Sequence, residues 1–395
     1  MDRAAAKQTV IAEIDRRADE LIRVSREIHA HPELAYQERF AHDVLTSAIA
    51  AAGLPVTTHA CGLDTAFMSV SGPADGPLVA VLCEYDALPG IGHACGHNII
   101  AAAGLGAGLA AATLADALGG RVMILGTPAE EGGGGKQKLI DAGAFAGVQA
   151  AMMVHPSSGD LSTMAAIAVQ NLTVRYFGKA AHAAAAPWKG ANALDAAVLG
   201  YMNVAALRQH IQPTERVHGI FVRAGDKPNI VPDYAESFWY VRSKTLRSLE
   251  PLKPRVLAAL EAGAHATGCT FEHEWDNTPY ADMVDNLPLL ELYMANAAAL
   301  GRVVVEADEG SEVVGSTDMG NVSHSVPAIH PMIKAAPEGC AIHTRDFATH
   351  AASPLGDQAV LDGAKAMAMT VIDFWLESGA RDLARHAFEQ SIQPV

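Results

Sequence analysis

Three short, uninterrupted apolar runs constrain the fold of this 395-residue chain more than any other feature of its sequence. They cover residues 78–83, 122–125 and 150–154, and each run ends in a polar or glycine-rich stretch. Unbroken apolar runs are typical of central sheet strands that helices cover on both faces. We therefore predict an α/β sheet, with the polar residues that follow each run at the carboxyl ends of strands, where open α/β sheets hold their sites.

A different pattern begins near residue 168, where apolar and polar residues alternate. Strands are expected at 171–177, 217–222, 235–241 and 270–275, and helices at 192–210 and 249–267. This order, β-α-β-β-α-β, describes a ferredoxin-like α+β sandwich. Before it, a near 3.6-residue apolar rhythm predicts one amphipathic opening helix that stops at 29–32; after it, helices are expected at 288–300 and 354–376. We therefore expect a domain of residues 168–285 inserted into a larger domain formed by 1–167 and 286–395.

The charge pattern excludes two classes of partner. The chain has 28 Lys and Arg against 44 Asp and Glu, a net charge of −16, and no block of like charge. Nucleic acids and anionic membranes both require basic patches, so we expect neither as a partner. The charged first 33 residues do not resemble a signal peptide, and the uncharged stretch 87–115 is mostly Ala and Gly, which predicts a buried helix. Five scattered cysteines do not form a disulfide framework, and a cytoplasmic protein is expected.

The first candidate site follows the apolar run 78–83. Here Cys95 and His97 lie two residues apart, and Gly96 permits the sharp turn that would bring the thiol and the imidazole to one metal ion. For an isolated pair of this kind, a buried cysteine in a glycine-rich turn with a hydrogen-bonded histidine nearby is the commoner explanation.

The second candidate site is the carboxylate pair Glu130 and Glu131, which follows the apolar run at 122–126 and precedes four glycines. Adjacent carboxylates repel each other unless a cation or a shared proton intervenes. In an extended segment they point to opposite sides, so one could bind metal while the other accepts a proton from water. Taken alone, the pair also fits a solvated acidic loop.

Histidines supply the remaining candidates. His155 follows the third apolar run, so three strands would deliver Cys/His, Glu/Glu and His to one edge of one sheet, and we predict a metal cluster there. Farther along the chain, His343 is the preferred additional ligand and His350 its nearest competitor. His182 lies in a polar turn before a predicted helix, which by itself indicates no function.

Together these motifs resemble the M20 metallopeptidase and amidohydrolase family, in the branch that holds aminoacylase-like hydrolases, p-aminobenzoyl-glutamate hydrolases and M20-domain-containing dipeptidases. The matching segments keep the family's order over nearly the whole chain: 84–98, 127–135, 154–156, 178–192, 229–232, 315–323 and 343–347. The resemblance implies a zinc-peptidase-like catalytic domain (1–167 and 286–395) interrupted by a lid (168–285) that also forms a homodimer interface.

The resemblance further implies hydrolysis of the amide bond of N-acyl amino acids, dipeptides or aryl-glutamates. It implies two divalent ions, zinc or manganese with cobalt possible, held by residues that match the family's ligands: Cys95, His97, Glu131, His155 and His343. Glu130 matches the general base. His182 matches a lid histidine that reaches into the partner's active site in dimeric members, and Asn229 matches a lid asparagine near the substrate. Arg242 is a candidate cation for a substrate carboxylate, although an ordinary surface arginine is the commoner explanation.

Two positions depart from the family pattern. Many relatives have Asp where this chain has Asn98, which we interpret as a subgroup mark, and Asp where it has Glu84. Glu84 leaves the coordination of the second ion open, while Asp86 is available to orient ligands. Two other functions are weighed against the metallohydrolase: a cysteine hydrolase using Cys95, and a protein of the same fold that binds an amide or peptide without cleaving it.

Overall fold

The computed structural model describes residues 1–276, 278–306 and 314–392, and the chain divides into two compact units. The larger unit consists of Met1–Ala165 and Met283–Val395, and the smaller unit of Ala166–Asp282. The sequence patterns had suggested boundaries at 168 and 285. Each unit has its own hydrophobic core, and each is described here by itself.

The larger unit is built on a six-stranded sheet. Its strands, in spatial order, are β1 (Thr57–Thr58), β2 (Phe67–Ser71), β4 (Arg121–Thr127), β3 (Leu78–Glu84), β5 (Val148–Met152) and β13 (Ala328–Ile329). β3 pairs in parallel with both β4 and β5, and β13 pairs in parallel with β5, whereas β2 runs antiparallel to β4. The three predicted strands are therefore neighbours, and their carboxyl ends lie at one edge.

Both faces of this sheet are buried, as the unbroken apolar runs predicted. In β3, Val79 and Val81 point into one hydrophobic core while Ala80 and Leu82 point into a second core on the opposite face. The first core is covered by helices α1 (Arg3–Arg16), α2 (Ala18–Ala30), α4 (His97–Ala112), α9 (Leu287–Ala299) and α12 (Pro354–Leu376). The second is covered by α6 (Gly135–Asp141) and α10 (Met319–Ser323). The α/β class is confirmed.

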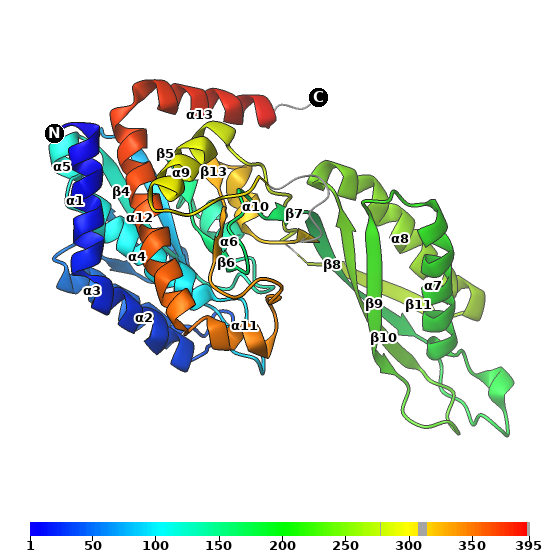
Figure 1. Cartoon of the computed structure of the whole chain (residues 1–395). Helices are drawn as coiled ribbons and strands as arrows, with labels where there is room; N and C mark the ends of the chain where they lie inside the picture. The colour runs from blue at the N-terminus through cyan, green and yellow to red at the C-terminus, as the bar shows by residue number, and fades with distance from the viewer. Residues whose placement is uncertain (277, 307–313, 393–395) are drawn as a thin grey trace. The chain divides into compact units, whose positions relative to one another are not determined.

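Helix α4 is the predicted buried helix, and its small residues let it lie close to the sheet. A Cβ atom at Gly104 would come within 2.3 Å of the Leu82 carbonyl oxygen, so only glycine fits there. Helix α12 packs along α4, and α1 packs along α12, so elements from opposite ends of the chain lie side by side (Figure 1).

The opening segment is two helices, which corrects the prediction of one. Arg17 separates α1 from α2 with φ −95° and ψ 5°, outside helical values. Its guanidinium pairs with Glu13 at 2.7 Å on one side and with Glu20 at 2.8 Å on the other. The apolar rhythm continues across this junction, so periodicity alone did not reveal the break.

The other elements of the larger unit are short, apart from helices α3 (Arg39–Ala51) and α13 (Ser378–Ser391). The short ones are η1 (Ala60–Gly62), α5 (Ala115–Leu118), β6 (His155–Ser157), β12 (Val314–Gly315), β14 (Met332–Lys334) and α11 (Arg345–His350), with β7 (Ala165–Ala166) at the passage to the smaller unit. No described helix combines the length and the apolar character that crossing a membrane requires. All five cysteines are free.

The smaller unit has the element order β-α-β-β-α-β. Its antiparallel sheet has the spatial order β11 (Thr270–Trp275), β8 (Ala168–Phe177), β10 (Tyr234–Ser243) and β9 (Arg216–Ala224). Helices α7 (Ala193–Leu207) and α8 (Leu246–Thr267) pack against each other and against this sheet (Figure 1), with η2 (Pro187–Lys189) and η3 (Arg208–His210) on either side of α7. α8 begins three residues before the predicted start because Thr245 and Ser248 form a capping box.

Candidate metal centre

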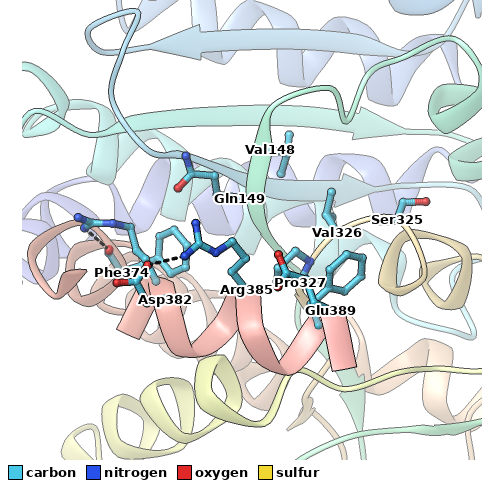
Figure 2. Close-up of a pocket in the computed structure, with 11 residues that line it drawn as sticks. Val148, Gln149, Ser325, Val326, Pro327, Phe374, Asp382, Arg385 and Glu389 are labelled. Atoms are coloured by element: carbon cyan, nitrogen blue, oxygen red, sulfur yellow. Dashed lines mark hydrogen bonds and ion pairs between the residues drawn. The ribbon is translucent and has the colours of Figure 1, made fainter. Parts of the chain in front are cut away.

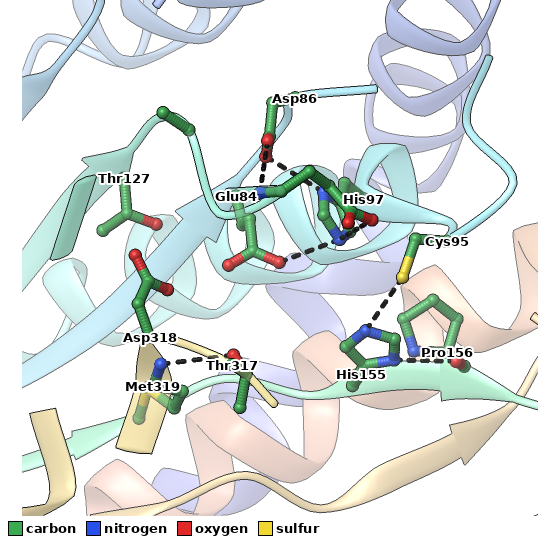
Figure 3. A network of polar contacts seen from close by, with 12 residues as sticks. Glu84, Asp86, Cys95, His97, Thr127, His155, Pro156, Thr317, Asp318 and Met319 are labelled. Atoms are coloured by element: carbon green, nitrogen blue, oxygen red, sulfur yellow. Dashed lines mark hydrogen bonds and ion pairs between the residues drawn. The ribbon is translucent and has the colours of Figure 1, made fainter. Parts of the chain in front are cut away.

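Four of the nine predicted site residues follow strands of the larger sheet at its carboxyl edge, and Figure 3 shows two of them, Cys95 and His97. Glu84 ends β3, and Glu130 and Glu131 follow β4. His155 differs slightly from the prediction, because β5 ends at Met152 and His155 opens the separate strand β6, which pairs with β14. The site is therefore assembled from several segments that are distant in the sequence.

Gly96 brings the Cys95 and His155 segments into contact. It has φ +78°, in the left-handed region, and a Cβ atom there would lie 2.5 Å from Cγ of Pro156. With no side chain in the way, Cys95 Sγ lies 3.4 Å from His155 Nε2. The turn at Gly96 that the sequence analysis required is present.

His155 is held in one tautomer. Its Nδ1 lies 2.9 Å from the Pro156 carbonyl oxygen, which can only accept, so Nδ1 carries the proton and Nε2 presents a lone pair toward Cys95. Burial and the nearby His97 lower the pKa of His155 to about 3. A neutral, oriented imidazole is the form that binds a metal ion.

His97 lies between two buried carboxylates. Its Nδ1 is 3.1 Å from Asp86 Oδ1, and its Nε2 is 3.1 Å from Glu84 Oε1. Burial alone would lower the pKa of His97, but Glu84, Cys95 and Asp86 together raise it well above the ordinary value. A histidine whose second nitrogen contacts a carboxylate is the usual arrangement around a metal ligand, and Asp86 has that position here.

The carboxylate pair adopts two different environments. Ala129, with φ 62°, turns the chain immediately before Glu130, and the Glu131 N–H donates to Asp86 Oδ2 at 2.9 Å. Glu130 is buried, and burial together with Glu84 and Glu131 raises its pKa well above the ordinary value. For Glu131 burial acts in the same direction, but hydrogen bonding to His343 and the charge of His97 outweigh it and lower its pKa. One carboxylate is thus suited to proton transfer and the other to remaining ionised.

His343 approaches the cluster from the C-terminal part of the chain. Its backbone has φ 63°, a left-handed value that residues other than glycine rarely adopt. Its N–H donates to the Ala94 carbonyl at 2.8 Å. The ring lies with Nε2 3.4 Å from Glu131 Oε1, and 51% of the side chain is exposed, so the cluster opens to solvent on this side. The competitor His350 instead groups with Cys340 and Asp346.

The donor atoms fit divalent metal ions. Ligand atoms lie within 4.8 Å of one another in three overlapping groups: Cys95 with His97 and His155, Cys95 with Glu131 and His343, and Glu84 with His97 and Glu130. Within the described residues, Glu84 Oε1 and His97 Nε2 are buried and make no hydrogen bond. Buried polar atoms left without hydrogen bonds are costly, and a shared cation would satisfy both. A thiolate, imidazoles and carboxylates suit zinc, and the carboxylates also accept manganese.

The sequence analysis missed a buried ion network beside this cluster. Lys136 is fully buried, and its Nζ contacts Glu84 Oε2 and lies 2.6 Å from Asp318 Oδ1. Burial would lower the pKa of Lys136, but Asp318 and Glu84 raise it above the ordinary value, so it is an ammonium. The residue stands directly after the glycine run, yet its partners are 52 and 182 positions away, so local sequence gave no signal of the pairing.

In the smaller unit, two of the three predicted residues lie together. The Ala183 N–H donates to the Asn229 carbonyl at 3.0 Å, which joins the His182 turn to the Asn229 loop. His182 is exposed, and its Nδ1 accepts from the N–H groups of the two residues at 184 and 185, at 3.3 and 3.1 Å, so Nε2 carries the proton. Arg242 lies apart from them, near the other end of β10, roughly 25 Å from the start of that strand at about 3.3 Å per residue.

A cavity of about 470 Å³ lies elsewhere in the larger unit, between α13 and the region of β5 (Figure 2). Its cations already have partners: Arg381 donates to the carbonyls of Phe374 and Trp375, and Arg385 pairs with Asp382 at 3.0 Å. The described residues that line it include none of the predicted metal ligands. The cluster at the sheet edge is therefore the candidate site.

The chain is similar to known proteins over most of its length. Residues 80–372 match peptidase family M20/M25/M40. The chain is 41% identical to the Xaa-Arg dipeptidase of Mus musculus over 402 residues, covering 98% of this chain and 93% of that protein. It is 28% identical to one of the subunits of p-aminobenzoyl-glutamate hydrolase from Escherichia coli, covering 90% of this chain and 89% of that protein. A solved Bacillus subtilis structure, described as a dinuclear metal binding peptidase from the M20 family, shares the fold with a TM-score of 0.68 at 22% identity, covering 91% of this chain and 98% of that one.

Proposed function

Because the chain belongs to peptidase family M20/M25/M40 and is a metal-dependent amide hydrolase, we propose that its substrates are dipeptides, first among them dipeptides with a C-terminal arginine. Support comes from the 41% identity to a protein named for that specificity, compared with 28% for the aryl-glutamate hydrolase. The observation that carries the proposal is the grouping of buried Cys95, His97 and His155 donor atoms within 4.8 Å, beside the buried Glu130.

In this proposal the larger unit is the catalytic domain and its sheet edge binds two divalent ions, zinc or manganese, with cobalt as a substitute. The proposed ligands are the matched set Cys95, His97, Glu131, His155 and His343. When bound, such a pair supplies Lewis acidity toward the amide carbonyl and toward a water molecule. The half-exposed His343 marks the side from which a substrate would enter.

Glu130 is the proposed general base. It takes a proton from water as the water oxygen bonds to the amide carbon, and it returns that proton to the amide nitrogen as the C–N bond breaks. The raised pKa of Glu130 supports both transfers, because it makes the carboxylate a better proton acceptor than an ordinary glutamate. No covalent intermediate forms.

The smaller unit is the proposed lid. The Nε2–H of His182 would donate to the oxygen that becomes negatively charged, and a donor of this kind contributes about 3–4 kcal/mol. Asn229 lies on the loop joined to His182 and would contact the substrate. Arg242 has no part in this proposal, because it lies near the opposite end of β10.

The smaller unit also supplies the proposed homodimer interface. Strand β9 is at the edge of its sheet, and the side chains of Ile220 and Val222 on it are 66% and 57% exposed. Met202 on α7 is 59% exposed as well. Exposed apolar residues on an unpaired edge strand favour pairing with another chain, and a second copy is the partner we propose.

A cysteine hydrolase is the weaker alternative. Burial raises the pKa of the Cys95 thiol, which opposes formation of the thiolate that a cysteine nucleophile requires. That reaction would also leave the Glu130–Glu131 pair without a role.

Glu130→Gln tests the mechanism, with a substrate panel to test the specificity. We expect kcat to fall by roughly 10²–10⁴-fold while the bound metal, measured by mass spectrometry, stays at the wild-type amount. In the wild type, kcat/KM should be highest for Xaa-Arg dipeptides, lower for neutral dipeptides, and lowest for N-acetyl amino acids and p-aminobenzoyl-glutamate. Retention of turnover by the variant would exclude Glu130 as the base, and preference for an aryl-glutamate would change the substrate class.

A further inference from the structure

Glu84 stands where many relatives have Asp, and its contacts suggest that it has a function in the metal centre. Its two carboxylate oxygens have different neighbours: Oε2 contacts the Lys136 ammonium, whereas Oε1 makes no hydrogen bond within the described residues and lies 3.1 Å from His97 Nε2. Figure 3 shows the carboxylate of Glu84 directed toward the ring of His97. When the His97 proton is on Nδ1, which lies 3.1 Å from Asp86 Oδ1, a cation between Glu84 Oε1 and His97 Nε2 would satisfy both of these buried atoms.

The spacing of the two atoms fits common ligands of one ion. Nitrogen and oxygen ligands that each lie about 2.1 Å from a metal ion are about 3.0–3.4 Å apart when they are adjacent in its coordination sphere. The 3.1 Å separation of Glu84 Oε1 and His97 Nε2 falls in this range. Both atoms come from rigid elements, because Glu84 ends β3 and His97 begins α4.

Lys136 fixes the orientation of Glu84. Its ammonium bridges Glu84 and Asp318, and Asp318 Oδ2 also accepts from the Lys136 backbone N–H at 2.9 Å. All three residues are fully buried, so Glu84 has no solvent into which it could rotate. The lysine therefore occupies one oxygen and leaves the other directed at His97.

More carboxyl groups than ammonium groups lie around Glu84. Among the described residues, the Lys136 ammonium lies near the carboxyl groups of Glu84, Asp318 and Glu130, while Asp86 lies near Glu84 and Glu131 lies near Glu130. A bound cation would offset part of this negative charge.

From this geometry we propose that Glu84 is an additional ligand of the ion held by His97, and that Lys136 is the positioning residue that presents it. This inference rests on the proposed function, because it concerns the same metal centre. It assigns the Glu84 departure a function: the longer side chain reaches both the lysine and the ion.

Metal affinity is the test. Wild type, Glu84→Gln, Lys136→Met and the double variant are compared with Lys138→Met, a control on the same helix whose ammonium lies over the Tyr36 ring. Zinc affinity is measured by chelator competition, and the cobalt-substituted proteins are compared by visible absorption. We expect two ions in wild type and control, and in Glu84→Gln one of the two bound on the order of 100-fold more weakly with changed cobalt d–d bands.

The lysine variant separates positioning from a general structural role. Lys136→Met should keep two ions but bind one of them roughly 10–100-fold more weakly, as expected for a residue that orients a ligand. Lys136→Met alone leaves two buried carboxylates, Glu84 and Asp318, without the ammonium, whereas the double variant leaves only Asp318. The double variant is therefore expected to fold more readily than Lys136→Met. It should bind one ion tightly.

The outcomes separate the assignment of Glu84 as a metal ligand from the proposed function as a metal-dependent hydrolase. Wild-type affinity for both ions in Glu84→Gln or in the double variant would overturn the assignment of Glu84 while leaving the hydrolase intact. Unchanged affinity in Lys136→Met would remove the positioning role. A wild type that binds no divalent ion and cleaves no amide would instead refute the proposed function itself.

Discussion

The two units of this protein differ in how deeply they bury charged groups. Beside its apolar cores, the larger unit contains the fully buried charged groups Lys136, Glu84 and Asp318, and the buried imidazoles His97 and His155. The smaller unit has an apolar core around Tyr176 and Trp239, and it leaves apolar residues of β9 and α7 exposed. Burying a charged group costs free energy unless the group is paired or binds a metal ion. A region that buries several charged groups is therefore better explained by a chemical function than by a contribution to stability.

This difference in buried charge suggests a division of roles between the two units. The larger unit would depend on bound ions for part of its stability, because several of its buried groups are satisfied only by cations. The smaller unit would fold on apolar burial alone and use its surface for contacts. Removing the metal, changing the surface and lowering the pH should therefore affect the two units unequally.

Metal removal should have the largest effect. Metal ions stabilise the charge that develops during amide hydrolysis by several kcal/mol, so stripping them with a chelator should reduce turnover by at least ~10³-fold. Peptides from the larger unit near Cys95, Glu131 and His155 should then exchange backbone hydrogens faster by mass spectrometry, while peptides from the smaller unit keep their rates. Adding zinc or manganese back should restore both readings. Equal acceleration of exchange in the two units would contradict the division.

Changing the exposed face of β9 should have an intermediate effect. Ile220→Asp places a charge on the proposed dimer interface, and it should weaken self-association by about 2–3 kcal/mol, or roughly 30–150-fold, because a buried unpaired charge is costly. Sedimentation velocity over a concentration series measures this change. Lys244→Asp, an exposed position that follows β10 and lies six residues beyond Phe238, the cross-strand partner of Ile220, is the comparison variant. The metal content of Ile220→Asp should remain that of the wild type, and loss of metal would show that the units are not independent.

Acid should destabilise the larger unit by a smaller, graded amount. Burial lowers the pKa of His93 to about 3, below the ordinary value of 6.5. Between these two pH values the unfolded chain binds a proton that the folded protein does not, so the free energy of unfolding falls as the pH decreases. One such histidine contributes up to about 1.4 kcal/mol per pH unit.

The matching experiment compares His93→Phe with His265→Gln, an exposed position of the smaller unit. Urea unfolding of the metal-free proteins is measured at pH 6, 5 and 4, with hydrogen exchange reporting on the larger unit. His93→Phe should have a shallower dependence of stability on pH than wild type, and His265→Gln should match wild type. An unchanged slope in His93→Phe would show that His93 does not remain neutral in the folded protein.

The sequence predicted the elements whose pattern is local. β11 and α12 begin and end where expected. The alternation of apolar and polar residues marks the ends of β11, and Ser353 followed by Pro354 marks the start of α12, so neighbouring residues are sufficient to predict both. The break at Arg17 was missed because apolar periodicity continues across it, and α13 was missed because it is polar and buries only Ala384 among its described residues.

For the site, the sequence was sufficient to predict the residue types and the strand ends, but it did not predict which distant residues form pairs. The carboxyl ends of β3 and β4 identified Cys95, His97 and the glutamate pair, because the sheet edge follows from the strands themselves. The buried pairs that Lys136 makes with Glu84 and Asp318 depend on how separate segments fold against one another, so nothing in the local sequence indicated them. The same reason explains why Arg242 could be named as a substrate cation although it lies far along β10 from the loop that is joined to the His182 turn.

The packing of α1 and α4 against α12 has a consequence for synthesis on the ribosome. The smaller unit is continuous in the chain, so all of its strands and helices have been translated once residue 282 has been added. The core of the larger unit lacks α12 until residues 354–376 have emerged. During that interval the surface of α4 that packs against α12 is uncovered, and we expect the nascent chain to bind chaperones that shield exposed hydrophobic segments.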